Sequence, residues 1–467
     1  MEVNRKEFLD AVKAAQKFSP TKSNLAVLRY LELDFGKSVK ISATNLDTYI
    51  TTTVEGNGEE KGKVYFTGKQ LADALKTIRG ETVTLEIANG DPEPNSCPKC
   101  GSEKFDMPEP VAEEEGVEKP EMQWNQVFCE KCGYIGKDKE FYHDRDPKLL
   151  NIGEFFSLAN TPLDDEFPTL PETPENTTLA FRTTVEKISK VLPAATREES
   201  GFKLNGVYFD DNRMVATDGH RMHWVDATVY ENAMLDVGFL KKLTCGKKPD
   251  TELHFHMETK VVEPTPVDEN IFSGLKKADL LEMWTENGYE EEAPKTVPTI
   301  KKRLVELMNE NQKPTAQVQK NHVYLEFGNT KIIHRPLEAN FPDYKVFISS
   351  VPEKTVTVES NLLLEAMEQS LAIANERYRA VKITFNGCLD MESFNPDVGE
   401  FKRVKVPVVS GAIDPEFTAG FNPQFIMEVM KLAEKKEEVR FCIPDDSGKP
   451  IYIQAEKFNA LVMAMRV

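Results

Sequence analysis

The chain contains a threefold internal repeat, which limits the folds that it can adopt. Helical patterns at residues 7–18, 184–195 and 361–372 each follow a short extended run and each precede two β-rich runs joined by a turn. The second β-rich run of each copy ends at a polar residue in the same slot: Asn45, Asp218 and Asn395. Because such a repeat builds the same supersecondary unit several times, the sequence predicts three similar α+β units.

A second helical pattern completes each copy, at residues 68–78, 237–245 and 422–436, and a charged turn and a strand follow it. A helix with one apolar face packs that face on the sheet of its own unit. The fold class is therefore α+β: three repeated domains, each with two helices packed on an antiparallel sheet. The helix faces that point away from the sheets can line a common surface. We place the domains at residues 1–172, 173–347 and 348–467.

The composition limits where the protein works and what it binds. With 77 acidic and 58 basic residues the formal charge is -19, which argues against coating nucleic acid unless the bases gather on one surface. No apolar run approaches the ~18 residues of a membrane helix, and the first ten residues do not form a secretory signal. Seven cysteines, three of them isolated, are typical of a reducing compartment. We expect a cytoplasmic protein.

The first unit carries an insertion over about residues 89–146 that contains two C-x-x-C pairs, Cys97 with Cys100 and Cys129 with Cys132. Four thiolates at two tight turns suit tetrahedral Zn²⁺, and a site filled by four sulfurs leaves no position open for substrate. We therefore expect a structural zinc ribbon. The loop between the pairs is acidic, which makes a protein contact more plausible than a phosphate contact.

A second insertion, over about residues 264–314, lies within the second unit. Its pattern is helix, polar loop and helix, with leucines, isoleucine and tryptophan at helical spacing. It resembles small SAP or Rho-N type helical modules, and Lys301, Lys302 and Arg303 are consistent with a nucleic-acid contact. An accessory hairpin that binds protein, or that only packs, is an equally good interpretation.

The segment VATDGHRMHWV (215–225) sets Asp218, His220 and Arg221 within four residues and so resembles part of an active site. The other two copies of the repeat have no histidine or arginine in this slot. No serine or cysteine nucleophile with a neighbouring base stands out, and no second carboxylate has acid/base spacing. A zinc hydrolase would need one open coordination position on the metal, and a site with four cysteine ligands leaves none. A specialised, non-catalytic surface is the better interpretation.

Five ordered motifs give the chain a family resemblance: VATDGHRMHW, NFPDYKVFI, ANERYRAVKI, GFNPQFIMEVM and VMAMRV. They resemble the corresponding segments of the bacterial DNA polymerase III beta sliding clamp, a processivity factor. The resemblance covers the whole chain except the two insertions. It implies a head-to-tail homodimer that closes a ring of six domains around duplex DNA, is opened by an ATP-driven clamp loader and tethers the DNA polymerase. A sliding clamp is not an enzyme, so no catalytic residue is expected.

The resemblance also implies a peptide-binding cleft between domains 2 and 3, where polymerase and clamp-loader subunits insert a short apolar segment. The residues that it assigns to the cleft are Leu204, Thr217, Gly219, His220, Arg221, Met222, Pro342, Tyr378, Asn422, Phe425, Pro450, Leu461, Val462, Met463, Met465 and Arg466. The chain departs from the family pattern at Met222, Val346 and Ala464, so its peptide preference is expected to differ. Flexible methionines suit a pocket that accepts several peptides.

A protein that slides should hold phosphates weakly and read no bases, so scattered basic residues are expected on the helices. The candidates are Arg5, Lys6, Lys13, Lys17, Lys69, Lys76, Lys187, Lys190, Lys241, Lys242, Lys431, Lys435 and Lys436. Helix 361–372 is the exception, with two glutamates and no base. Phe156 and Ile373 are the candidate dimer contacts by resemblance.

One alternative keeps the scaffold and changes the function. A clamp-like, zinc-containing nucleic-acid-binding regulator would not form a closed ring. Its DNA binding would depend on the two insertions and would need neither a free DNA end nor a loader.

Overall fold

The computed structural model shows how the three repeats are built and joined. It describes most of the chain outside the first insertion: residues 1–58, 60–89, 99, 105–106, 126–129, 131, 135–137, 148–153, 156–160, 166–196, 204–262, 268–286, 293–311, 315–338, 341–373, 380–395, 400–411, 413 and 416–466. Every strand pair in these residues is antiparallel, as the repeat predicts.

The first unit begins with a strand that turns directly into a helix. Asn4 accepts hydrogen bonds from the backbone N–H groups of Lys6 and Glu7, both at 3.0 Å, and so fixes the start of α1. The elements of the unit are β1 (Glu2–Asn4), α1 (Arg5–Gln16), η1 (Ala26–Arg29), β2 (Leu31–Phe35), β3 (Ser38–Thr44), β4 (Thr48–Asn57), β5 (Gly62–Phe66), α2 (Gly68–Thr77), β6 (Thr82–Asn89), β10 (Lys148–Ile152) and β11 (Phe156–Ala159).

The second unit repeats this order and carries the second insertion between two long strands. Its elements are β12 (Thr177–Thr184), α4 (Val185–Val191), η2 (Leu192–Ala194), β13 (Gly206–Asp210), β14 (Arg213–Thr217), β15 (Arg221–Asp226), β16 (Thr228–Val229), β17 (Ala233–Asp236), α5 (Val237–Thr244), β18 (Glu252–Val262), η3 (Glu269–Phe272), α6 (Lys277–Glu286), α7 (Val297–Asn311), β19 (Thr315–Phe327) and β20 (Thr330–His334).

A linker with one short helix, α8 (Lys345–Ile348), leads to the third unit, and the expected boundary at residue 347 lies within that helix. The elements that follow are β21 (Thr355–Glu359), α9 (Ser360–Ile373), β22 (Val381–Phe385), β23 (Cys388–Asn395), β24 (Glu400–Pro407), β25 (Phe417–Phe421), α10 (Pro423–Leu432), β26 (Glu438–Cys442), β27 (Ile451–Gln454) and β28 (Asn459–Val462).

Two predicted helices end earlier than the sequence pattern indicates. The first helix of the second unit continues after Val191 only as the 3-10 turn η2, because Pro193 has no N–H to donate to an α-helical bond. α10 was expected to reach residue 436 and ends at Leu432. Beyond it, the carboxylate of Glu437 accepts a bond from the N–H of Glu434 at 2.7 Å, and Lys436 has a φ of 63°. The helix ends because its cap, Ala433, has an extended backbone conformation, with φ -67° and ψ 156°.

The sheets run across the boundaries between units. In one junction β4 of the first unit pairs with β20 of the second, and in the other β15 of the second pairs with β28 of the third. As a result one sheet has 13 strands and another has eight. In each unit three consecutive strands form an antiparallel meander: β2, β3 and β4 in the first unit, and β13, β14 and β15 in the second. In both junctions the third strand of the meander pairs with the last strand of the next unit.

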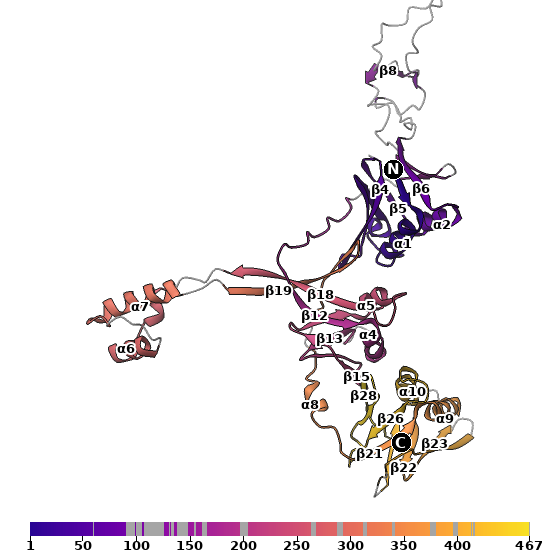
Figure 1. Ribbon diagram of the computed structural model, residues 1–467, viewed down its shortest axis with the longest axis vertical. Helices are drawn as coiled ribbons and strands as arrows, with labels where there is room; N and C mark the ends of the chain where they lie inside the picture. Colours follow the sequence, from indigo (N-terminus) through magenta and orange to yellow (C-terminus); the bar gives the residue numbers. More distant parts are fainter. Residues whose placement is uncertain are drawn as a thin grey trace, which may run out of the picture.

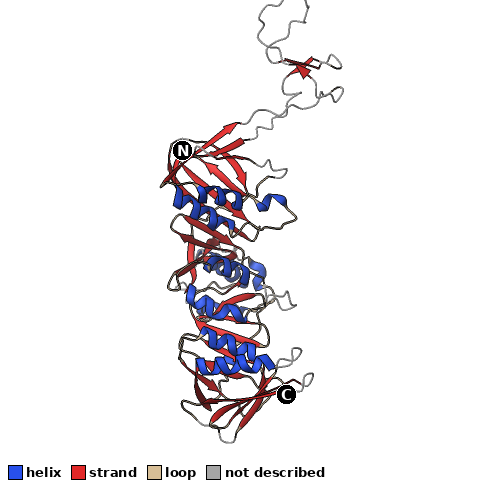
Figure 2. Ribbon diagram, turned by 90° about the vertical axis from the view of Figure 1, so that its right-hand side faces the viewer, coloured by secondary structure: helices blue, strands red, loops and turns tan. Residues whose placement is uncertain are grey.

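The helices of the repeats gather on one side of the molecule. α1, α2, α4, α5, α9 and α10 form a column along one face in Figures 1 and 2, with the sheets behind them. Their apolar sides are buried in the continuous core, as at Phe8, Ile188 and Met367. The common helical surface expected from the repeat is therefore present.

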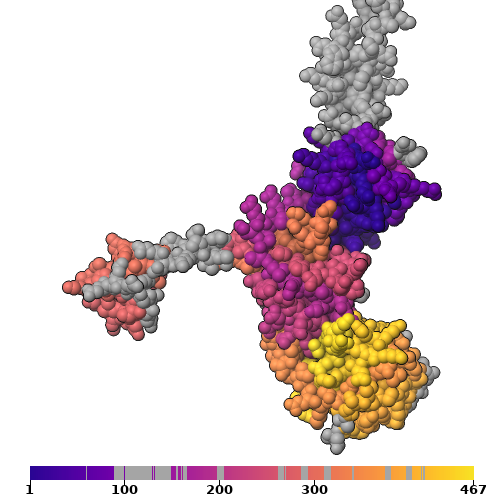
Figure 3. All heavy atoms as spheres, viewed as in Figure 1, coloured from indigo at the N-terminus to yellow at the C-terminus, as the bar shows by residue number. Residues whose placement is uncertain are grey.

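The second insertion folds as its own small unit. Phe272, Leu280, Trp284, Ile300 and Leu304 form a separate buried cluster together with Leu307. β18 and β19 extend from the second unit as a two-stranded arm that carries this helical module away from the body, on the side opposite the helix column (Figures 1 and 3). Within the described residues, no helix is both long and apolar enough to cross a membrane.

Candidate functional site

The turn between β14 and β15 holds the residues that resemble an active site. One carboxylate oxygen of Asp218 accepts from the backbone N–H groups of His220 (2.9 Å) and Arg221 (3.0 Å), and the other accepts from the Arg221 side chain. Gly219 between them has a φ of 85°, which a side chain would strain. The carboxylate therefore shapes the turn. It makes no hydrogen bond to the imidazole of His220, which a catalytic acid–base pair would need.

Arg221 links the second unit to the third. Its side chain, 10% exposed, donates from Nε to Asp218 Oδ2 at 3.0 Å and from Nη1 to a carboxylate oxygen of Glu428 on α10. Its guanidinium also lies over the ring of Phe425, 4.4 Å from the centroid. Sequence reasoning identified Arg221 and Phe425 but missed Glu428. Glu428 could have been predicted from the sequence, because it lies three residues after Phe425 and therefore on the same face of the helix.

The pairing of β15 with β28 brings the C-terminal motif beside this turn. Arg221 lies opposite Val462, and Met222 lies opposite Leu461. The N–H of Met463 then bonds to the carbonyl of His220 at 2.9 Å. The residues from the 217–222 segment and from the 461–466 segment, predicted separately, thus form one surface.

Apolar side chains from the linker cover one end of that surface. Tyr344 packs in a buried cluster with Met222 and Leu461, and Met463 lies against it. The next turn, α8, leaves Val346 and Phe347 exposed, at 61% and 41%. Exposed apolar residues beside half-buried methionines suit a docking surface. Sequence reasoning noted Val346 only as a departure from the family pattern, and missed Phe347.

The remaining predicted cleft residues lie around the same place or outside the described residues. Asn422 caps α10, and its side chain accepts from the N–H of Gln424 at 3.0 Å. The N–H of Met465 bonds to the carbonyl of Gly420 at 2.8 Å, which brings it to the start of that helix. Pro450 precedes β27, the neighbour of β28. The other positions are Leu204, Thr217 and Pro342, which are described, Arg466, which is exposed, and Tyr378, which lies outside the described residues.

The predicted DNA-facing bases lie on the helix column or at its ends. Nine of them are exposed and stand on α1, α2, α5 and α10 or just beyond: Lys6, Lys13, Lys17, Lys69, Lys76, Lys241, Lys431, Lys435 and Lys436. The half-buried ones are Arg5, Lys187, Lys190 and Lys242. α9 carries no base, and its Glu368 pairs with Lys431 of α10 at 3.7 Å.

Some of these bases also join one unit to the next. Lys17, just after α1, donates to the carbonyl of Cys245 at the end of α5, at 2.7 Å. Lys190 on α4 donates to the carbonyl of Leu432, the last residue of α10. In both junctions a lysine neutralises the partial negative charge where two helix C-termini meet. These lysines therefore have a structural role that their sequence position does not indicate.

Two buried histidines lie at the same junctions. His334 on β20 stacks on Phe239 with ring centroids 3.7 Å apart, and its Nδ1 lies 2.8 Å from the hydroxyl of Thr48 in the first unit. His223 on β15 bonds through Nδ1 to the carbonyl of Lys190 at 2.9 Å. Burial lowers the pKa of His334 to about 3 and that of His223 to about 4. Both imidazoles are therefore neutral at physiological pH.

Only one of the four predicted zinc ligands lies in the described part of the chain. Cys129 ends β8 (Gln126–Cys129) and is buried, whereas Cys97, Cys100 and Cys132 lie outside the described residues. β8 pairs with β7 (Phe105–Asp106) and with β9 (Ile135–Lys137). In the residues that can be placed, no group of three or more histidine, cysteine or acidic side chains could hold a metal.

The two predicted dimer contacts lie in the first and third units of the chain. Phe156 is the first residue of β11, at the outer edge of the 13-stranded sheet. Ile373 is the last residue of α9 in the third unit.

Comparison with known proteins points to one family. Residues 1–115 match the N-terminal domain of the DNA polymerase III beta subunit, and residues 348–466 match its C-terminal domain, so that together the matches span half of the chain. The beta sliding clamp of Pseudomonas aeruginosa is 23% identical over 325 residues, which cover 67% of this chain and 71% of that one. The beta sliding clamp of Haemophilus influenzae is 23% identical over 359 residues, 73% of this chain and 80% of that one.

Solved structures show the same fold. The crystal structure of the DNA polymerase III subunit beta from Pseudomonas aeruginosa aligns over the full length of both chains, with a TM-score of 0.66 and 17% identity. A sliding clamp from Bartonella birtlesii, bound to griselimycin, aligns over 100% of this chain with a TM-score of 0.66 and 16% identity.

Proposed function

The chain belongs to the DNA polymerase III beta subunit family and is a sliding clamp, an accessory processivity subunit without catalytic activity of its own. On that premise we propose that two copies close head to tail around duplex DNA. We further propose that polymerase and clamp-loader peptides dock on the surface that Arg221, Met463 and their neighbours form between the second and third units.

The observation that carries the ring is the rule of strand pairing between units. β4 pairs with β20 and β15 pairs with β28, so the third strand of each meander takes the last strand of the next unit. Two strands in the corresponding positions have no such neighbour in the described chain: β24 at one edge of its sheet and β11 at the edge of another. A second copy supplies the missing partner at each edge. A closed ring then leaves neither β24 nor β11 as an open edge that could aggregate.

The helix column supports the encircling role. If each junction turns the chain in the same sense, the six repeats of two copies place all helices on the inside. The exposed lysines on that face attract phosphates without reading bases, so the DNA is held weakly enough to slide. The excess of acidic residues then falls largely on other surfaces.

The docking surface offers both apolar and polar contacts to a short peptide. Met463, which packs on the buried Met222, supplies an adaptable apolar contact, and Val346 and Phe347 add exposed apolar side chains. His220 is exposed beside Phe425, with ring centroids 6.5 Å apart, so the imidazole can bond to a peptide carbonyl while an apolar side chain enters between the rings.

The decisive experiment measures solution mass and processivity together. We expect twice the mass of the 52.8 kDa chain, and a polymerase from the same source should copy longer stretches of primed DNA when the clamp is present. Phe156→Arg should give a monomer that no longer stimulates the polymerase. A wild-type monomer that binds DNA without a loader, through the insertions, would favour the regulator without a closed ring.

For the first insertion we propose a structural zinc site made by Cys97, Cys100, Cys129 and Cys132. What supports it is that Cys129 ends β8 and that Lys131, within the same C-x-x-C pair, lies in a turn. Metal analysis of the full chain should give one zinc per protomer, and Cys129→Ser should lose it without changing the dimer mass. No bound zinc in protein purified without chelator would refute the site.

A further inference from the structure

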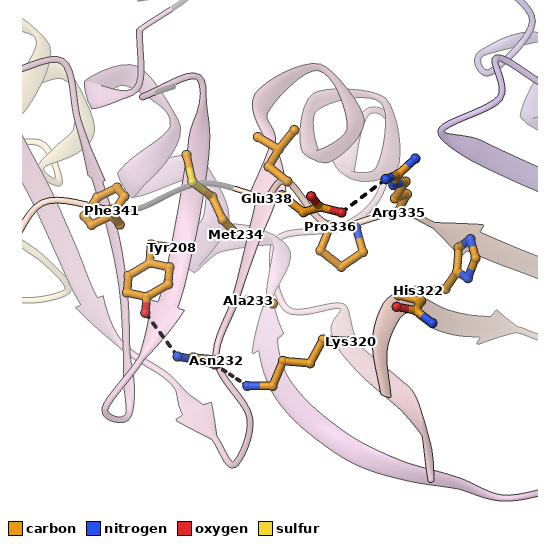
Figure 4. A pocket seen from close by; sticks show the side chains of 12 residues that line it. Tyr208, Asn232, Ala233, Met234, Lys320, His322, Arg335, Pro336, Glu338 and Phe341 are labelled. Atoms are coloured by element: carbon orange, nitrogen blue, oxygen red, sulfur yellow. Dashed lines mark hydrogen bonds and ion pairs between the residues drawn. The ribbon is translucent and has the colours of Figure 1, made fainter. Parts of the chain in front are cut away.

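The second unit has a hollow of about 650 Å³ that the clamp function does not use. It lies between β17, residues 320–322 of β19, residues 335–338 and Phe341 (Figure 4). At one end Tyr208 and Phe341 pack on the same buried cluster as Met463, but none of the residues predicted for DNA, peptide or dimer contacts line the hollow.

Two strand edges border this hollow. β20 pairs with β19 only from Val323 to Phe327, because β20 ends at His334, opposite Val323. The remaining part of β19, from Thr315 to His322, therefore has no residue of β20 beside it. Pro336 prevents the chain from continuing along that edge as a strand, because it has no N–H to donate. Among the described residues, no strand pairs with this side of Thr315–His322.

The other edge belongs to β17, the end strand of the eight-stranded sheet. On its outer side the carbonyl of Met234 accepts a bond from the N–H of Leu337 at 2.8 Å. This edge therefore already takes a backbone partner at one point. Unpaired strand edges are templates for a further strand, since their N–H and C=O groups point outward at the spacing of a ladder.

The side chains around the hollow differ from one end to the other. Figure 4 shows Tyr208 and Phe341 at one end, and their rings stack with centroids 4.9 Å apart. His322 and Arg335 lie at the opposite end, with Lys320 on the floor between them. A ligand that fills the hollow thus meets aromatic faces on one side and basic groups on the other.

The basic groups are held by partners that are partly or largely exposed. Arg335 pairs with Glu338 at 3.1 Å, and these side chains are 60% and 84% exposed. Lys320 pairs with Glu231 at 3.1 Å, with the two side chains 47% and 32% exposed, and it also donates to Oδ1 of the exposed Asn232 (Figure 4). Exposed pairs of this kind contribute little, about 0 to 1 kcal/mol, so a carboxylate of a ligand can replace them.

We propose that this hollow binds an extended, acidic segment of a protein partner, which adds as a strand to the free edge of β19. An apolar or aromatic side chain of the segment packs on Tyr208 and Phe341, and a carboxylate lies between Lys320 and Arg335. A peptide is the occupant because two strand edges line the site, and backbone groups in that arrangement recognise another backbone. A nucleic-acid duplex is too wide for a space of this volume.

The site goes beyond the proposed function and does not depend on it. A peptide can bind here whether or not the ring closes and whether or not the surface around Met463 is occupied. Its position at the base of the arm gives the second insertion a neighbouring contact point on the body, so that a partner held by the arm can also reach the clamp.

The test uses the full chain and a defined probe. The probe is a fluorescein-labelled ten-residue peptide of alternating glutamate and threonine with one central phenylalanine, followed by fluorescence anisotropy. Two control peptides replace the phenylalanine by alanine or all glutamates by lysine. We expect saturable binding of the probe, weaker binding of the alanine peptide and no binding of the lysine peptide.

Charge reversal on the protein identifies the site. Lys320→Glu with Arg335→Glu should weaken the probe at least tenfold, whereas Lys331→Glu should change its affinity less than twofold. Lys331 is the matched control because it is a lysine on β20, 57% exposed, paired with Glu326 at 3.1 Å and outside the hollow. All three positions are largely exposed, so the variants should fold, and an unchanged melting temperature verifies that.

Hydrogen exchange distinguishes this site from the other one. Bound probe should slow exchange of the amides in Thr315–His322, and Met463→Ala should leave probe binding unchanged. Protection confined to the surface around Met463, an equal effect of Lys331→Glu, or no binding of the acidic probe would each overturn the proposal. None of these results would bear on the ring or on processivity.

Discussion

Replacing Arg221 by methionine tests the link between the second and third units. Methionine keeps much of the length and apolar character of the stem but removes the guanidinium, which contacts Asp218, Glu428 and the ring of Phe425. The substitution leaves the Asp218 carboxylate, 16% exposed, with only its two backbone donors. The expected result is a less stable junction between the two units.

The magnitude follows from the burial of each contact. A hydrogen bond to a charged group at a site as buried as Arg221 and Asp218 contributes roughly 1.5 to 3 kcal/mol. Glu428 is 40% exposed, so its ion pair is discounted to about 0.5 kcal/mol. The stacking on Phe425 adds about 0.5 to 1 kcal/mol. Together these give a loss of about 3 kcal/mol in the free energy of unfolding.

Urea unfolding, followed by circular dichroism, measures this loss. The matched control is Arg213→Met on β14, whose guanidinium lies 3.7 Å from an exposed Asp211 carboxylate and should cost under about 0.5 kcal/mol. Glu428→Gln alone should cost about as little, and adding it to Arg221→Met should cost nothing further. Equal losses for Arg221→Met and Arg213→Met would refute the assignment of Arg221 as a link between the units.

Three further predictions concern the junctions and the arm. Because the pKa of His334 falls from 6.5 to about 3 on folding, the unfolded chain binds the proton first, and the stability that the neutral ring provides is lost as the pH falls below 6.5. Between pH 7.5 and 5, urea unfolding should show a loss of about 2 kcal/mol from this residue, absent in His334→Gln. Leu304→Ala should cost the helical module about 2 to 5 kcal/mol, with faster hydrogen exchange over residues 268–311 and unchanged dimer mass. Lys17→Met should lower the melting temperature more than Lys13→Met, because Lys17 bonds to the carbonyl of Cys245 in the next unit. Lys13 pairs only with the exposed Asp10 of its own helix, so Lys13→Met should mainly weaken DNA binding, measured at low salt.

Much of the fold could be read from the sequence because it depends on local patterns. Each repeat combines helical and strand periodicity over a few tens of residues, and Asn45 and Asp218 occupy the same slot in the structure as in the alignment of the repeats. The helical module was equally readable, since Leu280, Trp284 and Leu304 recur at helical spacing and do form its buried cluster. The end of α10 was not, because the side chain of Glu437 competes for the backbone there.

The candidate site was partly readable for a different reason. The segments 217–222 and 461–466 are recognisable by their residues, but only the pairing of β15 with β28 places them together. Glu428 and Phe347 carry no distinctive motif, and they are identified by what they contact. The hollow beside β19 could not be predicted from the sequence, because it depends on where β20 ends relative to β19 in the sheet.

The number of repeats, the order of their helices and strands, and the positions of both insertions could be predicted from the sequence, since they follow from periodicity and residue types along short stretches of chain. Which lysines join the units depends instead on the packing of the units against one another. Lys17 and Cys245 are 228 residues apart, and the 2.7 Å bond between them exists because two units pack with their helix ends together. Such a contact depends on the free energy of packing between units, and no pattern within either segment encodes it.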